Sequence, residues 1–338
     1  MGRRLEHVME LLGREPRRPD PKRLPEEVKL IYQEKRSDST RVQALRAELA
    51  QKKANPQPEK IRRLRWAVLI AVNLLFVLSY RIDIQLLEGA LTASRFMGFH
   101  MADLNASLQV MLAFKHVVVN LLIGTTTVFV LWWLLGGRTF CSWVCPYHLV
   151  AEWAEMVHVW LAKKKLVKDH PLDRRLRTVA WVVFAVLAFV TGYTVYETIS
   201  PTGILSRALI YGPGVALIWV GLLLLFEIFY SRRAWCRYLC PIGLTYGLVG
   251  ATSPLRVQYH LPTCFHEGEC RKVCLVPHVL DTVIMGRARG VHVDIGADCT
   301  RCGRCVDACP TGSLTFVYGR GQKGKEGALP PTQGEPAA

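Results

Sequence analysis

Residues Asp298–Pro310 read D-C-T-R-C-G-R-C-V-D-A-C-P and contain four cysteines at the spacing C-x2-C-x2-C-x3-C-P. Three thiolates this close on one tight loop can each bind a different iron of a [4Fe–4S] cluster, and the fourth cysteine usually serves a second cluster. Gly303 lets the loop turn without a Cβ in the way. A zinc ribbon is the alternative, but it uses two C-x2-C pairs with a long spacer. The stretch therefore predicts an iron–sulfur site.

An incomplete second copy of this pattern lies upstream, in Cys264–Cys274. Cys264, Cys270 and Cys274 fit the first, third and fourth cysteine positions of the same spacing. Glu267 stands where the second cysteine is expected. The chain therefore carries ligands for one complete cluster and for a second cluster that lacks a cysteine.

The fourth cysteine of each copy is expected to bind the cluster of the other copy, which divides the cysteines into two sets. The first set consists of Cys299, Cys302, Cys305 and Cys274. The second set consists of Cys264, Cys270 and Cys309. Three outcomes fit the incomplete second set. Glu267 or His266 completes a [4Fe–4S] cluster, a [3Fe–4S] cluster forms, or the cluster is absent or labile.

The composition indicates a membrane protein. The chain has 338 residues, of which 51% are apolar, with a formal net charge of +16 and a mean hydropathy of +0.19. Such an apolar chain is expected to cross a membrane several times, and its basic excess is expected to face anionic lipid. The eleven cysteines fall in metal-ligand spacings, which favours a reducing compartment over a disulfide framework. No basic and aromatic module points to nucleic acid.

Four apolar stretches are predicted to span the membrane, and they lie at 66–80, 117–135, 179–196 and 215–230. Lys and Arg concentrate before the first stretch, between the second and third, and after the fourth. The positive-inside rule therefore predicts a multi-pass protein of the bacterial inner membrane, with both termini and every cysteine in the cytoplasm.

A short motif follows the second and the fourth apolar stretch. Arg138–Pro146 and Arg233–Pro241 both have the pattern R-x-aromatic-C-x3-C-P. The membrane domain is therefore expected to consist of two hairpin repeats, with a new helix starting at each proline. We expect the motif thiols to form one shared site for a soft metal, with an iron–sulfur cluster favoured: Cys141, Cys145, Cys236 and Cys240. Redox dithiols, buried structural cysteines and a copper site are the alternatives.

The predicted fold is mainly α. Residues 1–60 form a basic N-terminal extension, 61–260 a four-helix transmembrane domain, 261–318 a small α+β module with two clusters, and 319–338 a disordered tail. Within the module, 291–295 and 314–318 are predicted strands. His116, at the outer end of the second apolar stretch, is a candidate for a quinol site because a neutral imidazole can accept a proton there.

Together these features resemble the NapH and MauN family of membrane polyferredoxins over residues 61–318, including the segment 85–100. The resemblance implies an electron-transfer subunit of a quinol dehydrogenase, which takes electrons from the quinone pool and passes them to a redox partner or periplasmic reductase. Glu267 in place of cysteine, and Leu275 where proline follows the fourth cysteine, depart from the family pattern.

Assembly proteins of the CcoG type, which serve cytochrome oxidase, share the C-x3-C-P motifs and a ferredoxin module. That resemblance implies a maturation factor whose motif thiols handle copper. A membrane anchor for another iron–sulfur subunit is the third alternative, and it would carry clusters without reacting with quinol.

Overall fold

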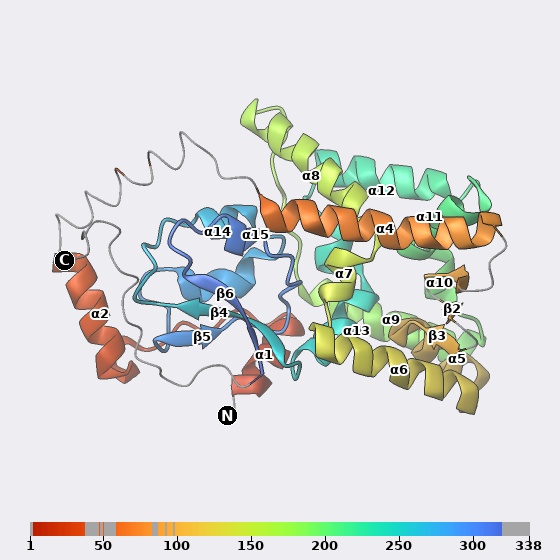
Figure 1. Cartoon of the computed structure of the whole chain (residues 1–338), viewed down its shortest axis with the longest axis horizontal. Coiled ribbons are helices and arrows are strands. Elements are labelled where there is room, and N and C mark those ends of the chain that lie inside the picture. The colour runs from red at the N-terminus through yellow and green to blue at the C-terminus, as the bar shows by residue number, and fades with distance from the viewer. Residues whose placement is uncertain are drawn as a thin grey trace, which may run out of the picture.

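The computed structural model describes residues 3–37, 47, 50, 59–82, 87–91, 93–96 and 99–319. Two parts lie side by side (Figure 1): a helical domain, and a smaller module built around a three-stranded sheet. The helical domain takes the middle of the chain and the module takes its C-terminal part, with the N-terminal helices α1 and α2 beside the module.

Apolar helices of different lengths build the helical domain. They are α4 (Lys60–Ile82), α5 (Leu104–Phe114), α6 (Val119–Leu135), α7 (Thr139–Trp143), α8 (Pro146–Lys163), α9 (Arg175–Thr191), α10 (Val195–Ile199), α11 (Pro201–Tyr211), α12 (Leu217–Phe229), the π-helix η2 (Trp235–Leu239) and α13 (Pro241–Gly250). Aromatic side chains fill the core between them, with Phe140 stacked on Tyr246 at 4.7 Å between ring centroids. These rings fix α7 and α13 against each other.

The four predicted spans are largely helical, yet within the described residues no helix has both the length and the apolar character that crossing a membrane requires. α6 and α9 have 17 residues each, and α12 has 13. Seventeen residues cover about 26 Å, against a hydrocarbon core of about 30 Å. α4 has 23 residues but carries Arg62, Arg63 and Arg65 near its start.

On this finding the predicted four-helix transmembrane domain is wrong. The predicted location as a multi-pass inner-membrane protein, with both termini and all cysteines on the cytoplasmic side, is wrong for the same reason. The number of apolar residues in a stretch does not show where its helix ends, and the helix ends decide the length available for crossing a membrane.

The second cysteine of each R-x-aromatic-C-x3-C-P motif stands directly before a helix. Cys145 is the N-cap residue of α8 and Cys240 that of α13, both with extended backbone, and a proline follows each as predicted. Proline suits the first helical turn because its missing N–H would have no partner there. Each motif therefore directs its second cysteine to the start of a helix.

The module contains an antiparallel sheet in the order β5-β4-β6. β5 (His292–Asp294) and β6 (Leu314–Tyr318) fall on the two predicted strands, whereas the central strand β4 (Leu255–His260) was not predicted. β4 precedes residue 261, so the sheet begins before the predicted start of the module. The short helices α14 (Glu269–Val273) and α15 (Arg304–Asp307) and the 3-10 helix η3 (Pro277–Val283) complete the module.

The N-terminal segment packs against the module. It contains α1 (Arg3–Leu11), η1 (Pro21–Arg23) and α2 (Glu26–Ser37). Val28 and Tyr32 of α2 are buried in the core of the module, and the Lys35 ammonium donates to the carbonyls of Leu261 and Cys264. The first part of the predicted N-terminal extension therefore forms part of the packed structure of the module.

A second small sheet, β1 (Leu87–Ala90), β2 (Ala93–Phe96) and β3 (Phe99–Ala102), is an antiparallel meander within the segment 85–100 and just beyond it. Residues 85, 86, 92, 97 and 98 of that segment lie outside the described residues. The predicted tail, apart from Gly319, lies outside them as well.

Candidate metal centres

One cavity of the module is lined by four cysteines from two separate segments, and they are Cys274, Cys299, Cys302 and Cys305. This is the first set expected from the sequence. Burial raises the pKa of Cys274, Cys299 and Cys305 because it disfavours the thiolate. The iron atoms of a cluster supply positive charge that offsets this cost, so the lining fits a [4Fe–4S] cluster.

The backbone of the cluster loop is held in a tight turn. Arg301 and Gly303 have left-handed φ angles of +52° and +75°. The Arg301 N–H donates to Cys299 Sγ at 3.4 Å, and the Arg301 side chain donates to the carbonyls of Leu255 and Gly250. The loop is thereby anchored to β4 and to the end of α13.

A second cavity brings the two C-x3-C-P motifs together, and its lining includes Cys141, Cys145, Cys236 and Cys240. The sequence predicted that these thiols share one site. Burial raises the pKa of Cys141 to about 12 and that of Cys145 to about 11. Cys145 and Cys240 are buried, and Cys141 and Cys236 are half-buried. Four thiols in one cavity form a set of soft ligands that fits a cluster in the same way as the first set.

These two cavities are adjacent, because Val276 and Thr300 line both of them. Ser142, between the cysteines of the first motif, donates its hydroxyl to the Thr300 carbonyl at 2.7 Å. Arg237, between the cysteines of the second motif, donates to the Leu275 carbonyl at 2.8 Å. The two motifs are therefore bonded directly to the segments that carry the first set.

The remaining cysteines also lie close together. Burial is the main cause that raises the pKa of Cys270 to about 12, and the neighbouring Cys264 and Cys309 thiols add to it. Cys270 lies on α14 and Cys305 on α15, and these two short helices pack against each other, so the second set adjoins the first. Glu267 is half-buried in the same loop.

The described residues contain no group of three His, Cys, Asp or Glu side chains arranged to hold a single metal ion. The thiolates of a [4Fe–4S] cluster bind four different iron atoms, so they are not expected to meet at one point.

Buried ion pairs, which the sequence did not reveal, stabilise the cavity that the two C-x3-C-P motifs share. Arg233, the first residue of the second motif, lies 2.7 Å from Glu155. Arg65 pairs with Glu152 at 2.5 Å, and its guanidinium lies 2.9 Å from His148. All five side chains are buried, and burial of charge is tolerated only where charges are paired.

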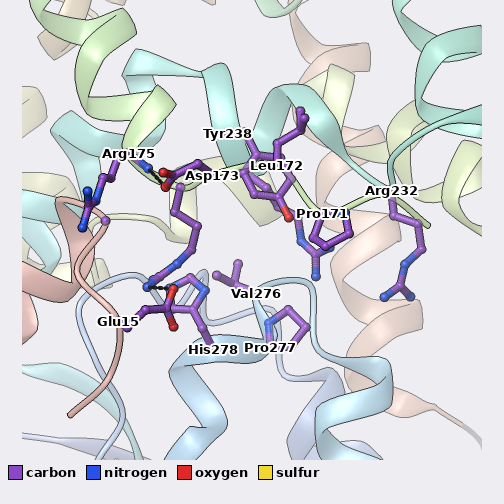
Figure 2. A pocket seen from close by; sticks show the side chains of 13 residues that line it. Glu15, Pro171, Leu172, Asp173, Arg175, Arg232, Tyr238, Val276, Pro277 and His278 are labelled. Atoms are coloured by element: carbon purple, nitrogen blue, oxygen red, sulfur yellow. Dashed lines mark hydrogen bonds and ion pairs between the residues drawn. The ribbon is translucent and has the colours of Figure 1, made fainter.

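A further, open cavity has a volume of about 680 Å³, and Figure 2 shows the side chains that line it. Val276 lines this cavity as well as both others. Its basic side chains are Arg174, Arg175, Arg232 and Arg237. Two carboxylates also line it, so the arginines give it a net excess of two positive charges (4 − 2), with Glu15 lying 3.2 Å from Arg174. No motif in the sequence indicated this cavity.

His116 lies in the exposed bend between α5 and α6. The 17 residues of α6 separate it from the C-x3-C-P motif, which corresponds to about 26 Å. The structure therefore does not place His116 beside the cysteine sites.

Family models match both parts of the chain. A model described as "4Fe-4S binding domain" matches residues 117–168 and 212–257, and each segment contains one C-x3-C-P motif. A second model with the same description matches residues 295–315, the cluster loop of the module. The chain therefore contains 4Fe–4S binding domains in both parts.

Similar proteins are ferredoxin-type proteins. The methylamine utilization ferredoxin-type protein MauN of Methylorubrum extorquens is 34% identical over 56% of this chain and 64% of its own length. MauN of Paracoccus denitrificans is 35% identical over 63% of this chain and 75% of its own length. The ferredoxin-type protein NapH of Escherichia coli is 33% identical over 58% of this chain and 67% of its own length. No solved structure matches.

Proposed function

Since this chain belongs to the family of ferredoxin-type proteins that includes MauN and NapH, we propose that it passes electrons from a quinol to a redox partner through three sets of cysteines. Its role as a ferredoxin-type 4Fe–4S electron-transfer protein follows from the family. The quinol, the ligand sets and the route are the proposal.

The observation that carries the proposal is the shared wall of the two cysteine cavities. Val276 and Thr300 contribute to both linings, so redox groups held in them would be separated by little more than one layer of side chains. Cys270 of α14 and Cys305 of α15 extend the series to the second set, because these two helices pack against each other. The proposed route of the electrons therefore runs along three neighbouring sites. They are the C-x3-C-P site, the first set and the second set, in that order.

Clusters supply one-electron chemistry, whereas a quinol releases two electrons and two protons. A series of sites allows the two electrons to leave one after the other. In this proposal the protein residues hold the clusters, exclude water from them and accept the protons. His116 is the proton acceptor predicted from the sequence, because a neutral imidazole nitrogen can accept a proton.

The basic cavity is the place we propose for the redox partner. Val276 brings its lining next to two cysteine sites, and its excess positive charge attracts an acidic surface. Arg175 is exposed there and can contact a partner.

The proposed function is tested with the full chain purified without oxygen. A menaquinol analogue is expected to reduce the clusters, as followed by EPR, and dithionite is the control reductant. His116→Ala is expected to slow reduction by the quinol but not by dithionite. Reduction by dithionite alone in the unaltered protein would contradict quinol oxidation, and equal rates in both proteins would remove His116 from the mechanism.

A further inference from the structure

The two cysteine loops of the module have the same backbone conformation. When Cys264 is aligned with Cys299, His266 corresponds to Arg301 and Gly268 to Gly303. The φ angles of the first pair are +59° and +52°, and those of the second pair are +81° and +75°. Left-handed angles are rare outside glycine, so their recurrence at both positions marks one shared loop structure.

Hydrogen bonds agree with this equivalence. The N–H of His266 donates to Cys264 Sγ at 3.4 Å, and the N–H of Arg301 donates to Cys299 Sγ at the same distance. A short helix follows each loop, with Gly268 as the N-cap of α14 and Gly303 as that of α15. The loop that lacks a cysteine has therefore kept the cluster-binding conformation.

Glu267 occupies the position in this loop that Cys302 occupies in the other. The matched φ angles of the residues on either side predict that its Cβ faces the second set as that of Cys302 faces the first. His266 instead corresponds to Arg301, which is not a ligand position of the other loop, and its Nδ1 donates to the Val283 carbonyl oxygen at 2.7 Å. We propose that the Glu267 carboxylate is the fourth ligand of the second cluster, beside Cys264, Cys270 and Cys309.

This assignment makes one iron atom different from the other three. Carboxylate oxygen is a harder ligand than thiolate and binds iron in a sulfide cluster less strongly. The iron held by Glu267 is therefore expected to leave and return more readily, so that the cluster interconverts between [4Fe–4S] and [3Fe–4S] forms. The proposal concerns the cofactor and does not depend on quinol as the substrate.

The test uses the full chain, from which mild oxidation removes one iron and one electron. ⁵⁷Fe(II) is then added anaerobically together with a thiol reductant, which returns the electron that the [4Fe–4S] form requires, and Mössbauer and EPR spectra are the readouts. Unaltered protein is expected to take ⁵⁷Fe into one position and to show a [3Fe–4S] signal before the addition. Glu267→Ala is expected to keep the [3Fe–4S] signal after iron is added. Glu267→Cys is expected to suppress exchange, because four thiolates then hold the cluster.

His266→Ala is the matched control, and it is expected to exchange iron as the unaltered protein does. The spectrum of the first cluster shows in every variant whether the module is folded. Full [4Fe–4S] reconstitution in Glu267→Ala, unchanged exchange in Glu267→Cys, or loss of the fourth iron in His266→Ala would each overturn the assignment.

Discussion

Arg138 and Asp298 form a buried ion pair that joins the first C-x3-C-P motif to the cluster loop of the module. Arg138 is the first residue of the motif, and Asp298 directly precedes the first cysteine of the loop. Arg177 of α9 adds a second contact to the same carboxylate at 2.8 Å. The two arginines hold the pKa of Asp298 well below its usual range against the opposing effect of burial.

Replacement of Asp298 by Asn is expected to lower the free energy of unfolding by about 3–5 kcal/mol, because two buried guanidinium groups lose their counter-charge. Chemical denaturation measures the change. Glu59→Gln is the control: it removes a more exposed partner of Arg62 and is expected to cost less than about 1 kcal/mol. Similar losses of unfolding free energy in Asp298→Asn and Glu59→Gln would show that the buried ion pair stabilises the fold no more than the exposed one does.

Cys236→Ser is expected to remove about four iron and four sulfide per chain if the two C-x3-C-P motifs hold one cluster. Cys302→Ser is the matched variant and is expected to remove the EPR signal of the first cluster in the module. Metal and sulfide analysis of the full chain gives both results. Copper in the unaltered protein, lost in Cys236→Ser, would favour a copper-handling maturation factor, and unchanged iron would reject the shared cluster.

Arg175→Glu is expected to change how the reduced protein reacts with charged oxidants. At low ionic strength the variant should be oxidised about tenfold more slowly by ferricyanide and faster by hexaamminecobalt(III), because the basic cavity steers anions toward the wall beside two cysteine sites. Stopped-flow absorbance measures both rates, and salt is expected to reduce the difference.

Arg63→Glu provides the control for this charge change, since Arg63 is exposed on α4 and does not line the cavity. Equal effects of the two substitutions would indicate that only the net charge of the protein matters, and would remove the cavity as the proposed docking place.

Glu197 is expected to make stability fall as pH rises. Burial, and then the neighbouring Asp103 carboxylate, raise its pKa from 4.5 to about 7. Between these values the folded state keeps a proton that the unfolded state has lost, so the free energy of unfolding decreases by up to about 3 kcal/mol. Glu197→Gln is expected to abolish this part of the pH dependence, as measured by denaturation near pH 5 and pH 8. An unchanged profile would contradict the raised pKa.

Two glycines in equivalent loops provide a matched pair of substitutions. Alanine at either Gly268 or Gly303 must adopt a left-handed backbone, at a cost of about 1–2 kcal/mol. A Cβ at Gly303 would also lie 2.3 Å from Ile61 Cγ2, whereas Gly268 has open space. Gly303→Ala is therefore expected to cost about 1–3 kcal/mol more than Gly268→Ala in chemical denaturation. Equal losses of unfolding free energy in Gly303→Ala and Gly268→Ala would mean that α4 shifts away from the new Cβ at no cost.

The contact at Gly303 also shows how α4 is joined to the module. Asp307 Oδ2 accepts the N–H groups of Ile61 and Arg62 at 2.9 and 3.2 Å, and so caps the first turn of α4. The capping residue and the helix it caps are more than two hundred residues apart in the chain, so no local sequence signal could indicate the pair.

The iron–sulfur chemistry of this protein can be predicted from its amino-acid order. The spacing Cys299–Cys302–Cys305 is a local property of one loop, and a tight loop leaves few arrangements for its thiols. The same holds for the helices that begin at Pro146 and Pro241, because proline acts on its own turn. The repeated C-x3-C-P motif likewise indicated four thiols, although not what they bind.

The features that depend on distant segments appear only in the folded chain. The tertiary structure placed Val276 and Thr300 between two cysteine cavities and added β4 to the sheet of the module. It also corrected the predicted membrane spans, because an apolar stretch does not reveal where its helix ends. Side-chain chemistry and short spacing are carried by the chain itself, whereas helix ends, shared walls and buried ion pairs arise only when remote residues pack together.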